Sequence, residues 1–371
     1  MKILHINSYY SVSHFYKNLY DKQIEKGLDI DVFVPVTSSI KLKEADLGDY
    51  TTISLNHSKY DRYIFHLKHY KIYKDVESKY KIEDYSLVHA HSLFSNGYIA
   101  MKLKRDYGVP YVVAVRNTDV NLFFDRLPHL RRLGIKILKE AKAIVFLSKV
   151  YRDAVIQKYV PNKLKEEIYK KSSIIPNGIN DFWFENIGTK KKTPDKDNIK
   201  LLHVGVVDKN KNIITTVKAI EILQQKGYNI EFTVVGRIKD KEIYNKIKDL
   251  HFVNYISPKP KEELIEIYRK SDIFVMPSIT ETFGLVYAEA MSQGIPIIYT
   301  RGQGFDGQFE EGVVGFSVRY NSVEEIAEKI TIIMNNYRVI SNNCTKIVKK
   351  FKWETIAQKY LVIYKGQINQ S

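Results

Sequence analysis

The sequence has one cysteine, two tryptophans and no long hydrophobic run. The single cysteine, Cys344, excludes an internal disulfide and a metal site built from several cysteines. No window of the chain approaches the apolar length that a transmembrane helix needs. Residues 1–6 follow a strand pattern directly, without the long apolar region of a signal peptide. We therefore expect a cytoplasmic protein.

Length and composition indicate a globular chain with two domains. A chain of 371 residues is longer than one hydrophobic core usually serves. Its 44% of hydrophobic and 27% of charged residues are typical of globular proteins. The net charge of +16 lies mainly in residues 1–180, which hold 30 Lys and Arg against 19 Asp and Glu, a balance of +11.

Two basic stretches concentrate this charge, Lys59 to Lys81 and Arg126 to Lys142. Such surfaces attract anionic lipid headgroups or nucleic acid, although a solvated helix face carries the same charges. Residues 130–138 mix Arg and Lys with Leu and Ile at helical spacing, which predicts an interfacial helix on a membrane, with core packing as the alternative. No nucleic-acid-binding motif is present, so we expect no nucleic acid partner.

Strand patterns alternate with helical patterns along the whole chain, which predicts an α/β protein with two doubly wound sheets. The polar residues 188–198 form the predicted loop between the two halves. Helices are expected over 213–226, 261–270 and 323–334. The expected strands are 2–6, 30–36, 86–89, 111–115, 143–147, 173–175, 200–204, 231–235, 273–276, 295–299 and 315–318.

The stretch from Pro277 to Pro296 carries two carboxylates, Glu281 and Glu289, around a predicted helix start. A buried strand precedes it, a turn covers 280–283, and Gly294 with Pro296 ends the helix. The first N–H groups of a helix carry the positive end of its dipole and suit a phosphate. Here these are the N–H groups near Phe283, Gly284 and Leu285. Ordinary helix charges are the alternative interpretation of both glutamates.

Polar residues also follow the other predicted strands. In α/β proteins ligands bind at the carboxyl ends of the strands, so these residues become candidates for a cleft. They are Tyr9 to His14, His89 with His91, Arg116 to Asp119, and Gly205 to Lys211.

The motif around the two glutamates resembles the signature of retaining glycosyltransferase family 4. Phe-Gly-Leu follows Glu281, Glu-Ala-Met includes Glu289, and Gly-Ile-Pro comes next. The resemblance covers nearly the whole chain, and its other segments are Met1–Ser8, Leu87–His91, Ile175–Ile179, Ser271–Ser278 and Phe351–Tyr360.

This resemblance implies a GT-B fold with two Rossmann-like domains facing a central cleft. We expect an acceptor-binding domain over 1–180, a nucleotide-sugar-binding domain over 181–350, and a final helix over 351–368 that packs back on the first domain. The resemblance also implies transfer with retention, no metal requirement and no cofactor besides the nucleoside diphosphate sugar, for which a UDP-sugar is favoured.

The resemblance also implies roles for single residues. Glu281 and Arg116 are the expected catalytic residues. The expected donor-binding residues are Gly205, Lys211, Arg237, Ile256, Thr282, Phe283, Gly284, Leu285 and Glu289. The expected acceptor or sugar contacts are Ser11, Ser13, His91, Asn117, Asp119 and Gly304, and no metal ligand is expected.

The chain departs from the family pattern in both halves. Val206 stands where an arginine is usual, and another cation must then balance the leaving diphosphate, with Arg237 and Arg301 as candidates. Tyr9 to His14 replaces a Gly-Gly pair, and Arg116 replaces a histidine. Both arginine candidates can equally be surface residues, and Arg116 with Asp119 can form a structural ion pair.

The sequence therefore predicts a retaining glycosyltransferase, a hexosyltransferase-type enzyme. We expect it to move a sugar to a saccharide or lipid-linked acceptor in bacterial cell-surface polysaccharide synthesis. The protein is expected in the cytoplasm, with peripheral association at the inner face of the plasma membrane. The alternatives are a GT-B sugar phosphorylase, a nucleotide-sugar epimerase, or a basic membrane- or nucleic-acid-binding module.

Overall fold

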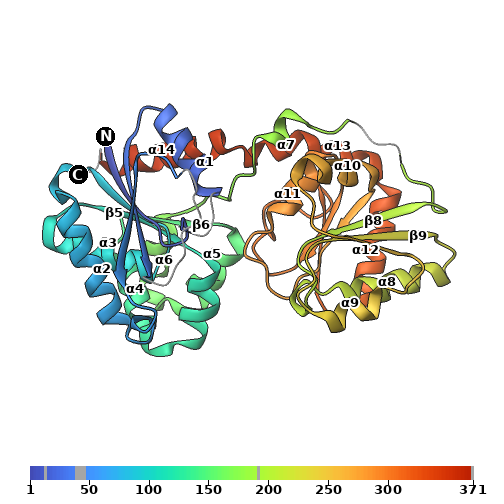
Figure 1. The fold of residues 1–371 in the computed structure, drawn as a ribbon, viewed down its shortest axis with the longest axis horizontal. Helices are drawn as coiled ribbons and strands as arrows, with labels where there is room; N and C mark the ends of the chain where they lie inside the picture. Colours follow the sequence, from blue (N-terminus) through green and yellow to red (C-terminus); the bar gives the residue numbers. More distant parts are fainter. Residues whose placement is uncertain (12–14, 38–46, 190–192, 369–371) are drawn as a thin grey trace. The chain divides into compact units, whose positions relative to one another are not determined.

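The structure is a computed structural model that describes residues 1–11, 15–37, 47–189 and 193–368. The chain forms two compact units (Figure 1). Unit 1 contains Met1–Pro176 and Trp353–Ser371, and unit 2 contains Asn177–Lys352. The chain therefore returns to the unit in which it begins.

Unit 1 is built on a parallel sheet of seven strands in the order β3-β2-β1-β4-β5-β6-β7. Its central strands are rich in β-branched residues and fully buried, as parallel strands covered on both faces require. The strands are β1 Lys2–Ile6, β2 Asp29–Thr37, β3 Thr51–His57, β4 Leu87–Ala90, β5 Tyr111–Val115, β6 Ala143–Phe146 and β7 Ser172–Ile174.

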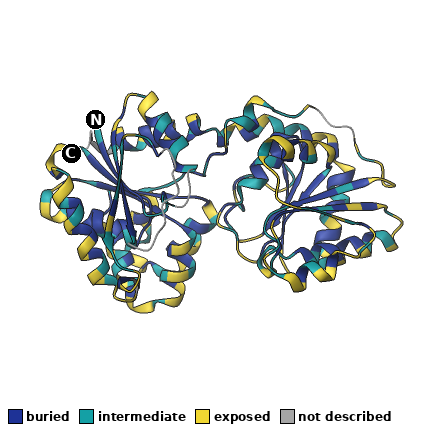
Figure 2. Ribbon diagram, viewed as in Figure 1, coloured by how far each residue is buried: buried dark blue, intermediate teal, exposed yellow. Residues whose placement is uncertain are grey.

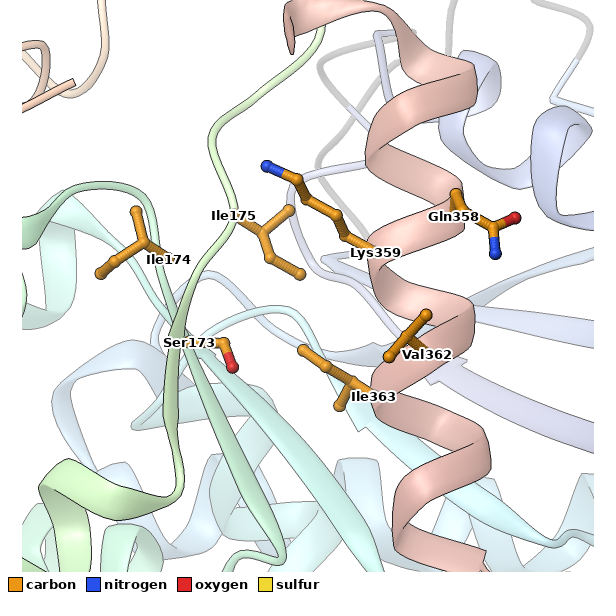
Figure 3. Close-up of a pocket in the computed structure, with 7 residues that line it drawn as sticks. All are labelled: Ser173, Ile174, Ile175, Gln358, Lys359, Val362 and Ile363. Atoms are coloured by element: carbon orange, nitrogen blue, oxygen red, sulfur yellow. The ribbon is translucent and has the colours of Figure 1, made fainter. Parts of the chain in front are cut away.

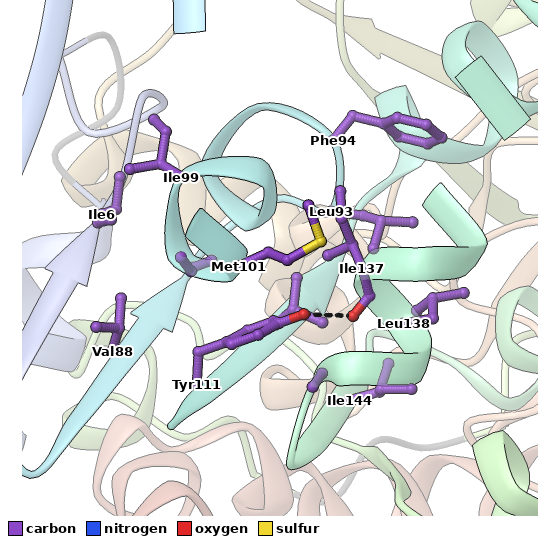
Figure 4. Packing of buried hydrophobic residues seen from close by; sticks show 14 of the residues in the cluster. Ile6, Val88, Leu93, Phe94, Ile99, Met101, Tyr111, Ile137, Leu138 and Ile144 are labelled. Atoms are coloured by element: carbon purple, nitrogen blue, oxygen red, sulfur yellow. Dashed lines mark hydrogen bonds between the residues drawn. The ribbon is translucent and has the colours of Figure 1, made fainter. Parts of the chain in front are cut away.

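Helices cover both faces of this sheet. One face packs against α1 and α14, and the other against α2 to α6 (Figure 2). Figure 4 shows the core on the face that α2 to α6 cover, where the Tyr111 hydroxyl donates to the Ile137 carbonyl at 2.6 Å. The helices are α1 Phe15–Glu25, α2 Phe65–Lys79, α3 Ser95–Tyr107, α4 Arg131–Glu140, α5 Lys149–Tyr159, α6 Asn162–Lys170 and α14 Trp353–Ile368, with the short turns η1 Asp61–Tyr63, η2 Ile82–Asp84, η3 Asp119–Phe124 and η4 Pro128–Leu130.

The last helix, α14, is part of the core of unit 1. Trp353, Ile356 and Tyr364 are buried with residues of α1 and the sheet. The Tyr364 hydroxyl also contacts Nδ1 of His89 at 2.6 Å. A cavity of about 390 Å³ lies between α14 and the end of β7, lined by Ile174, Ile175 and Ile363 among others (Figure 3).

Unit 2 repeats the architecture with a parallel sheet of six strands in the order β10-β9-β8-β11-β12-β13. The strands are β8 Ile199–Val204, β9 Ile230–Val235, β10 Val253–Ile256, β11 Ile273–Val275, β12 Ile297–Thr300 and β13 Gly315–Val318. The helices are α7 Phe182–Glu185, α8 Ile213–Gln225, α9 Lys241–Ile247, α10 Lys261–Lys270, α11 Leu285–Ser292, α12 Val323–Asn335 and α13 Tyr337–Ile347, with the turns η5 Lys209–Lys211 and η6 Val348–Phe351.

The predicted α/β fold with two doubly wound sheets is confirmed. The sequence patterns missed two strands, β3 and β10, and both lie at the edge of a sheet. Most residues of these strands are half-buried or exposed, so neither strand has the continuous apolar run of a central strand.

The prediction of an interfacial helix over 130–138 is wrong. Leu130, Ile137 and Leu138 are buried, and Leu133 with Ile135 packs against the same core of unit 1. The apolar face of α4 therefore belongs to the interior, which was the alternative interpretation. The exposed residues of this helix are all charged: Arg132, Lys136 and Lys139.

Candidate functional site

Two predicted site residues meet at the carboxyl edge of the unit 2 sheet. Strands β8 and β11 are parallel neighbours, so the loops that follow them lie side by side. The first loop holds Lys211 in η5, and the second holds Glu281 before α11. Lys211 Nζ donates to Glu281 Oε2 at 2.5 Å, and the two side chains are 19% and 13% exposed. Solvent therefore screens this ion pair only in part.

Backbone contacts fix the position of the Glu281 loop. The Glu281 N–H donates to Oε1 of Gln303 at 2.9 Å, and the Gly304 N–H donates to the Glu281 carbonyl at 3.1 Å. A Cβ atom at Gly304 would lie 1.7 Å from the Thr282 carbonyl oxygen, so this position requires glycine. The predicted sugar contact Gly304 therefore supports the loop that carries Glu281.

The start of α11 is arranged as the sequence pattern predicts. Gly284 has φ +75°, and a Cβ atom there would lie 2.4 Å from the Tyr287 ring. No side chain of the described residues caps this helix, so its first-turn N–H groups at Leu285 and Val286 can serve a ligand. Phe283 is buried against Phe305 and Phe351, so it can offer only its backbone.

Glu289 lies in the last part of α11 and is half-buried. Burial raises the pKa of its carboxyl to about 7, and the hydrogen bond with Tyr268 partly offsets this. The Tyr268 hydroxyl donates to Glu289 Oε2 at 3.2 Å. This carboxyl therefore gains or loses its charge near neutral pH.

Close backbone packing shapes the loop after β8. A Cβ atom at Gly236 would lie 1.8 Å from the Gly205 carbonyl oxygen, whereas one at Gly205 would meet Lys211 at an ordinary 3.5 Å. Asp208 caps η5 and accepts the Lys211 N–H at 3.1 Å. Buried His203 lies beside this lysine, and burial, helped by the Lys211 charge, lowers the pKa of His203 to about 3.

The other predicted donor-binding residues lie at separate points along the carboxyl edge of the unit 2 sheet. Arg237 is exposed after β9 and makes no side-chain hydrogen bond or ion pair with the described residues. The Ile256 carbonyl, at the end of β10, accepts the Gly236 N–H at 3.0 Å. Arg301 pairs with Glu325 at 2.5 Å and contacts Ser317, so it forms a structural ion pair in this structure.

In unit 1, Asp119 and Arg116 belong to one buried loop. The Asp119 carboxylate accepts three backbone N–H groups, from Leu93, Phe94 and Arg116, at 2.8 to 3.1 Å. Burial raises its pKa to about 6. Arg116 Nε donates to the His91 carbonyl at 3.2 Å. Asp119 thus shapes the loop, and its contact with a sugar stays a prediction.

His91 is packed in the interior with two other histidines. His5 Nδ1 and His91 Nε2 are 3.0 Å apart, and the rings of His89 and His91 lie 4.0 Å apart. Burial lowers the pKa of His5 to about 3, so these imidazoles are neutral. Their ring nitrogens lie within 4.8 Å of one another, and among the described residues this trio has the spacing to hold a metal ion.

The other predicted acceptor contacts have separate surroundings. The Asn117 amide donates to the Tyr151 hydroxyl at 3.0 Å and accepts from Asn121 at 2.8 Å. Ser11 lines a cavity of about 180 Å³ after β1, whereas Ser13 lies outside the described residues. Sequence patterns did not indicate Gln303 or Tyr268, because each acts by holding a neighbouring residue.

Two family models match the chain, one in each half. The model described as Glycosyltransferase Family 4 matches residues 12–181, and the model described as Glycosyl transferases group 1 matches residues 185–351. Together they span both units.

Named relatives match at low identity over much of the chain. An uncharacterized glycosyltransferase of Methanocaldococcus jannaschii is 24% identical over 344 residues, 87% of this chain and 91% of its own. The alpha-monoglucosyldiacylglycerol synthase of Acholeplasma laidlawii is 24% identical over 312 residues, 77% and 76% of the two chains. The capsular polysaccharide biosynthesis glycosyltransferase CapM of Staphylococcus aureus is 29% identical over 175 residues, 44% and 46%.

The fold resembles those of solved proteins, among them a glycosyltransferase from Rickettsia africae with a TM-score of 0.70 at 18% identity, over 100% of this chain and 99% of that one. The Anabaena protein HepE, solved in complex with UDP, superposes with a TM-score of 0.73 at 16% identity, over 99% of this chain and 100% of that one. The fold, the family models and the relatives define the class: the protein is a glycosyltransferase of the GT-B type, similar to glycosyltransferase family 4. Its relatives include enzymes named for polysaccharide and glycolipid synthesis.

Proposed function

We propose that this glycosyltransferase transfers a hexose, with retention, from a nucleoside diphosphate sugar to a saccharide or lipid-linked saccharide. A UDP-sugar is the favoured donor, and cell-surface polysaccharide synthesis is the proposed setting. The contact of Lys211 with Glu281, beside the uncapped start of α11, carries the proposal. The HepE structures with UDP and with UDP-glucose support the choice of donor by analogy of fold.

Lys211 and the start of α11 are the proposed diphosphate site. When the sugar bond breaks, negative charge develops on the leaving diphosphate, and a cation with oriented N–H groups stabilises it. Lys211 can exchange its contact with Glu281 for one with the phosphate. Val206 offers no charge here, so exposed Arg237 is the proposed second cation. We propose that no metal ion is needed, because these groups supply the positive charge.

Glu281 is the proposed catalytic carboxylate. Its loop is held by Gln303 and Gly304, so the carboxylate is positioned before the donor binds. It would fix the hydroxyls of the donor sugar and stabilise positive charge near the anomeric carbon. In unit 1, Arg116 is the proposed further contact for the sugar or its phosphate.

Glu289 is the proposed ribose-binding residue. An ionised carboxylate accepts hydrogen bonds from two vicinal hydroxyls, whereas a protonated one accepts fewer. The Tyr268 hydroxyl donates to Oε2 of Glu289 and so orients the carboxylate. With a pKa of about 7, this interaction strengthens as the pH rises through neutrality.

Replacing Glu281 separates binding from chemistry. Glu281→Gln should remove most sugar transfer while the affinity for UDP stays close to that of the wild type, because the amide keeps the size of the carboxylate. UDP release from UDP-sugars and UDP titration calorimetry measure the two properties. Turnover of the variant at the wild-type rate would contradict the catalytic assignment.

A donor-only incubation distinguishes the alternative activities. A nucleotide-sugar epimerase converts the donor without an acceptor, and a phosphorylase needs inorganic phosphate in place of a nucleotide. We expect no epimer when the purified protein is incubated with UDP-sugars, GDP-sugars or ADP-sugars alone, and no sugar 1-phosphate when it is incubated with an oligosaccharide and inorganic phosphate. A thermal-shift screen with UDP, GDP and ADP ranks the bases, since a ligand that binds only the native state raises its stability.

We also propose that the protein associates peripherally with the inner face of the plasma membrane. Among the described residues, no helix has the length and apolar character to cross a bilayer. An apolar stripe is nevertheless exposed along η1 and the start of α2, at helical spacing: Tyr60, Tyr63, Ile64, Leu67 and Tyr70. The opposite side of α2 packs in the core through Ile72, Tyr73 and Val76.

Charge around this 60–70 stripe favours an anionic bilayer. Residues 58–74 contain five cations, Lys59, Arg62, Lys68, Lys71 and Lys74, against one acid, Asp61. Apolar and aromatic side chains flanked by lysines are typical of surfaces that lie in the headgroup region of a membrane. The stripe therefore replaces residues 130–138 as the membrane-facing segment.

Vesicle binding tests this surface. The double variant Ile64→Ser, Leu67→Ser should lose at least about tenfold in affinity for phosphatidylglycerol vesicles, a loss of about 1.4 kcal/mol. The matched control is Val339→Ser, Val362→Ser, which changes two exposed apolar residues elsewhere and should bind as the wild type does. Equal vesicle binding by the stripe variant and the wild type would contradict the membrane assignment.

A further inference from the structure

A second polar cavity lies at the carboxyl edge of the unit 1 sheet. It has a volume of about 180 Å³ and is lined by residues that follow or end β1, β2 and β3 and by residues of α2 and α3. Ser8 and Ser11 come from the loop after β1, Lys68 and His69 from α2, and Asn96 from the first turn of α3. This edge is where α/β domains bind ligands.

Lys68 gives the cavity a positive charge that forms no ion pair within the described part of the chain. The other described lysines of α2 form ion pairs: Lys71 with Asp61, Lys74 with Glu77 and Lys79 with Asp75. Lys68 forms no ion pair or hydrogen bond with any described residue, and it is half-buried. Burial lowers the pKa of its ammonium group, although Asp61 partly offsets this.

Two buried polar atoms of the cavity lining lack a hydrogen-bond partner among the described residues. Ser8 Oγ donates to Asn96 Oδ1 at 2.5 Å, which orients the amide and leaves Asn96 Nδ2 as a donor with no partner. His69 Nδ1 donates to the Phe65 carbonyl at 2.6 Å, which leaves Nε2 as an acceptor with no partner. Asn96 is fully buried, and His69 is 2% exposed. Buried polar groups are normally paired, so these two atoms point to a ligand.

The donor set selects the ligand chemistry. An ammonium group and an amide N–H₂ group both favour oxygen atoms with negative charge. Neutral imidazole nitrogens accept hydrogen bonds from hydroxyl groups instead. His57 fits this second role, because burial, helped by the Lys68 charge, lowers its pKa to about 4. The cavity thus suits an oxyanion with hydroxyls beside it.

We propose that this cavity binds the oxyanion of the sugar acceptor, a phosphate or carboxylate group carried next to free hydroxyls. The inference rests on the proposed transferase function and adds the charge class of the acceptor. Lys68 and Asn96 contact the anionic oxygens, and His69 accepts a hydrogen bond from a neighbouring hydroxyl. Neutral acceptors would leave the Lys68 charge without a partner and bind more weakly.

Site-resolved lysine labelling tests the binding directly. The protein is labelled with an amine-reactive reagent, with and without inorganic phosphate, a soluble sugar phosphate or glycerol 3-phosphate as a soluble lipid headgroup, and each lysine is quantified by mass spectrometry. At ten times the dissociation constant, Lys68 labelling should fall about tenfold by mass action, whereas Lys74 labelling should not change. Protection by any of the three supports the oxyanion site and identifies the source, and protection by none overturns it.

Two variants address the same cavity with different chemistry. Lys68→Met removes the cation, and Asn96→Asp places a negative charge where the oxyanion binds. With UDP present to fill the donor site, both should lose phosphate binding, with Lys74→Met as the matched control on the same helix. In transfer assays with an anionic acceptor, both should raise KM for the acceptor at least about tenfold, about 1.4 kcal/mol, with the KM for the donor unchanged. Equal phosphate binding by Lys68→Met and wild type overturns the inference.

The thermal shift that UDP produces distinguishes a failure of the oxyanion site from a failure of the proposed transferase function. Folded variants should retain the thermal shift that UDP produces, because the donor site lies in unit 2. If UDP does not stabilise the wild type, the proposed transferase function fails, while the phosphate experiment still reports on the cavity. If UDP stabilises every variant and phosphate protects none, only the oxyanion site fails.

Discussion

At the scale of residues, the donor site depends on two carboxylates in different environments. Glu281 touches a lysine and a backbone N–H group, whereas Glu289 is half-buried with a tyrosine hydroxyl as its partner. The sequence motif predicts both glutamates, Glu281 in the turn before α11 and Glu289 within the helix. It does not predict their electrostatics, because the partners come from distant segments, Lys211 from the loop after β8 and Tyr268 from α10.

The pKa of Glu289 predicts a pH-dependent affinity for UDP. The carboxylate accepts the ribose hydroxyls in its ionised form, and its pKa is about 7, so the affinity should fall by up to about tenfold from pH 8 to pH 6. Glu289→Gln cannot titrate and should bind more weakly at pH 8 with a flatter profile. Calorimetry with UDP from pH 6 to pH 8 gives the affinity profile of each protein. Dividing one profile by the other cancels the effect of the protonation of UDP itself. Parallel profiles would contradict the assignment.

At the scale of elements, glycines determine how the site loops approach one another. The start of α11 requires a positive φ at Gly284, and the loop after β12 requires close contact at Gly304. Helices and central strands were predictable from their apolar patterns. The edge strands β3 and β10 were not, and neither was a lysine on α2 that lacks an ion pair among the described residues, because exposure and pairing depend on segments far away in the sequence.

Gly304→Ala tests the packing between these loops. The added Cβ atom would lie 1.7 Å from the Thr282 carbonyl, so the Glu281 loop must move, at a cost of about 1–3 kcal/mol. Chemical denaturation should show this loss of stability in unit 2, and the rate of sugar transfer should fall with it. Gly366→Ala is the control, since no atom lies within 4 Å of its added Cβ atom. Unchanged stability and transfer in Gly304→Ala would exclude the supporting role.

At the scale of the whole molecule, the end of the chain completes the unit in which the chain begins. Helix α14 buries Trp353, Ile356 and Tyr364 against the face of the sheet that α1 also covers. The resemblance to family 4 implied that the last helix packs on the first domain. The amphipathic pattern of the helix alone did not, because such a pattern does not identify the unit against which a helix packs. The stability of unit 1 therefore depends on residues that follow all of unit 2 in the sequence.

Trp353→Ala tests the dependence of unit 1 on α14. Trp353 is 2% exposed and packs against Phe15, so its truncation should destabilise unit 1 by about 3–5 kcal/mol. Hydrogen exchange should show faster exchange in unit 1, with the UDP-induced protection in unit 2 retained. Val362→Ala on the exposed face of the same helix should change stability by less than about 0.5 kcal/mol. Faster exchange confined to unit 2 would contradict the assignment of α14.

The affinity for UDP of wild type, Lys211→Met and Lys209→Met, measured by calorimetry, tests the central claim most directly. Lys209 lies in the same short helix as Lys211 but is 70% exposed, so it is a matched control. If Lys211 holds the diphosphate, Lys211→Met should weaken UDP binding at least about tenfold, about 1.4 kcal/mol, while Lys209→Met binds as the wild type does. Equal affinities for all three proteins would contradict the donor site at the Lys211 and Glu281 pair.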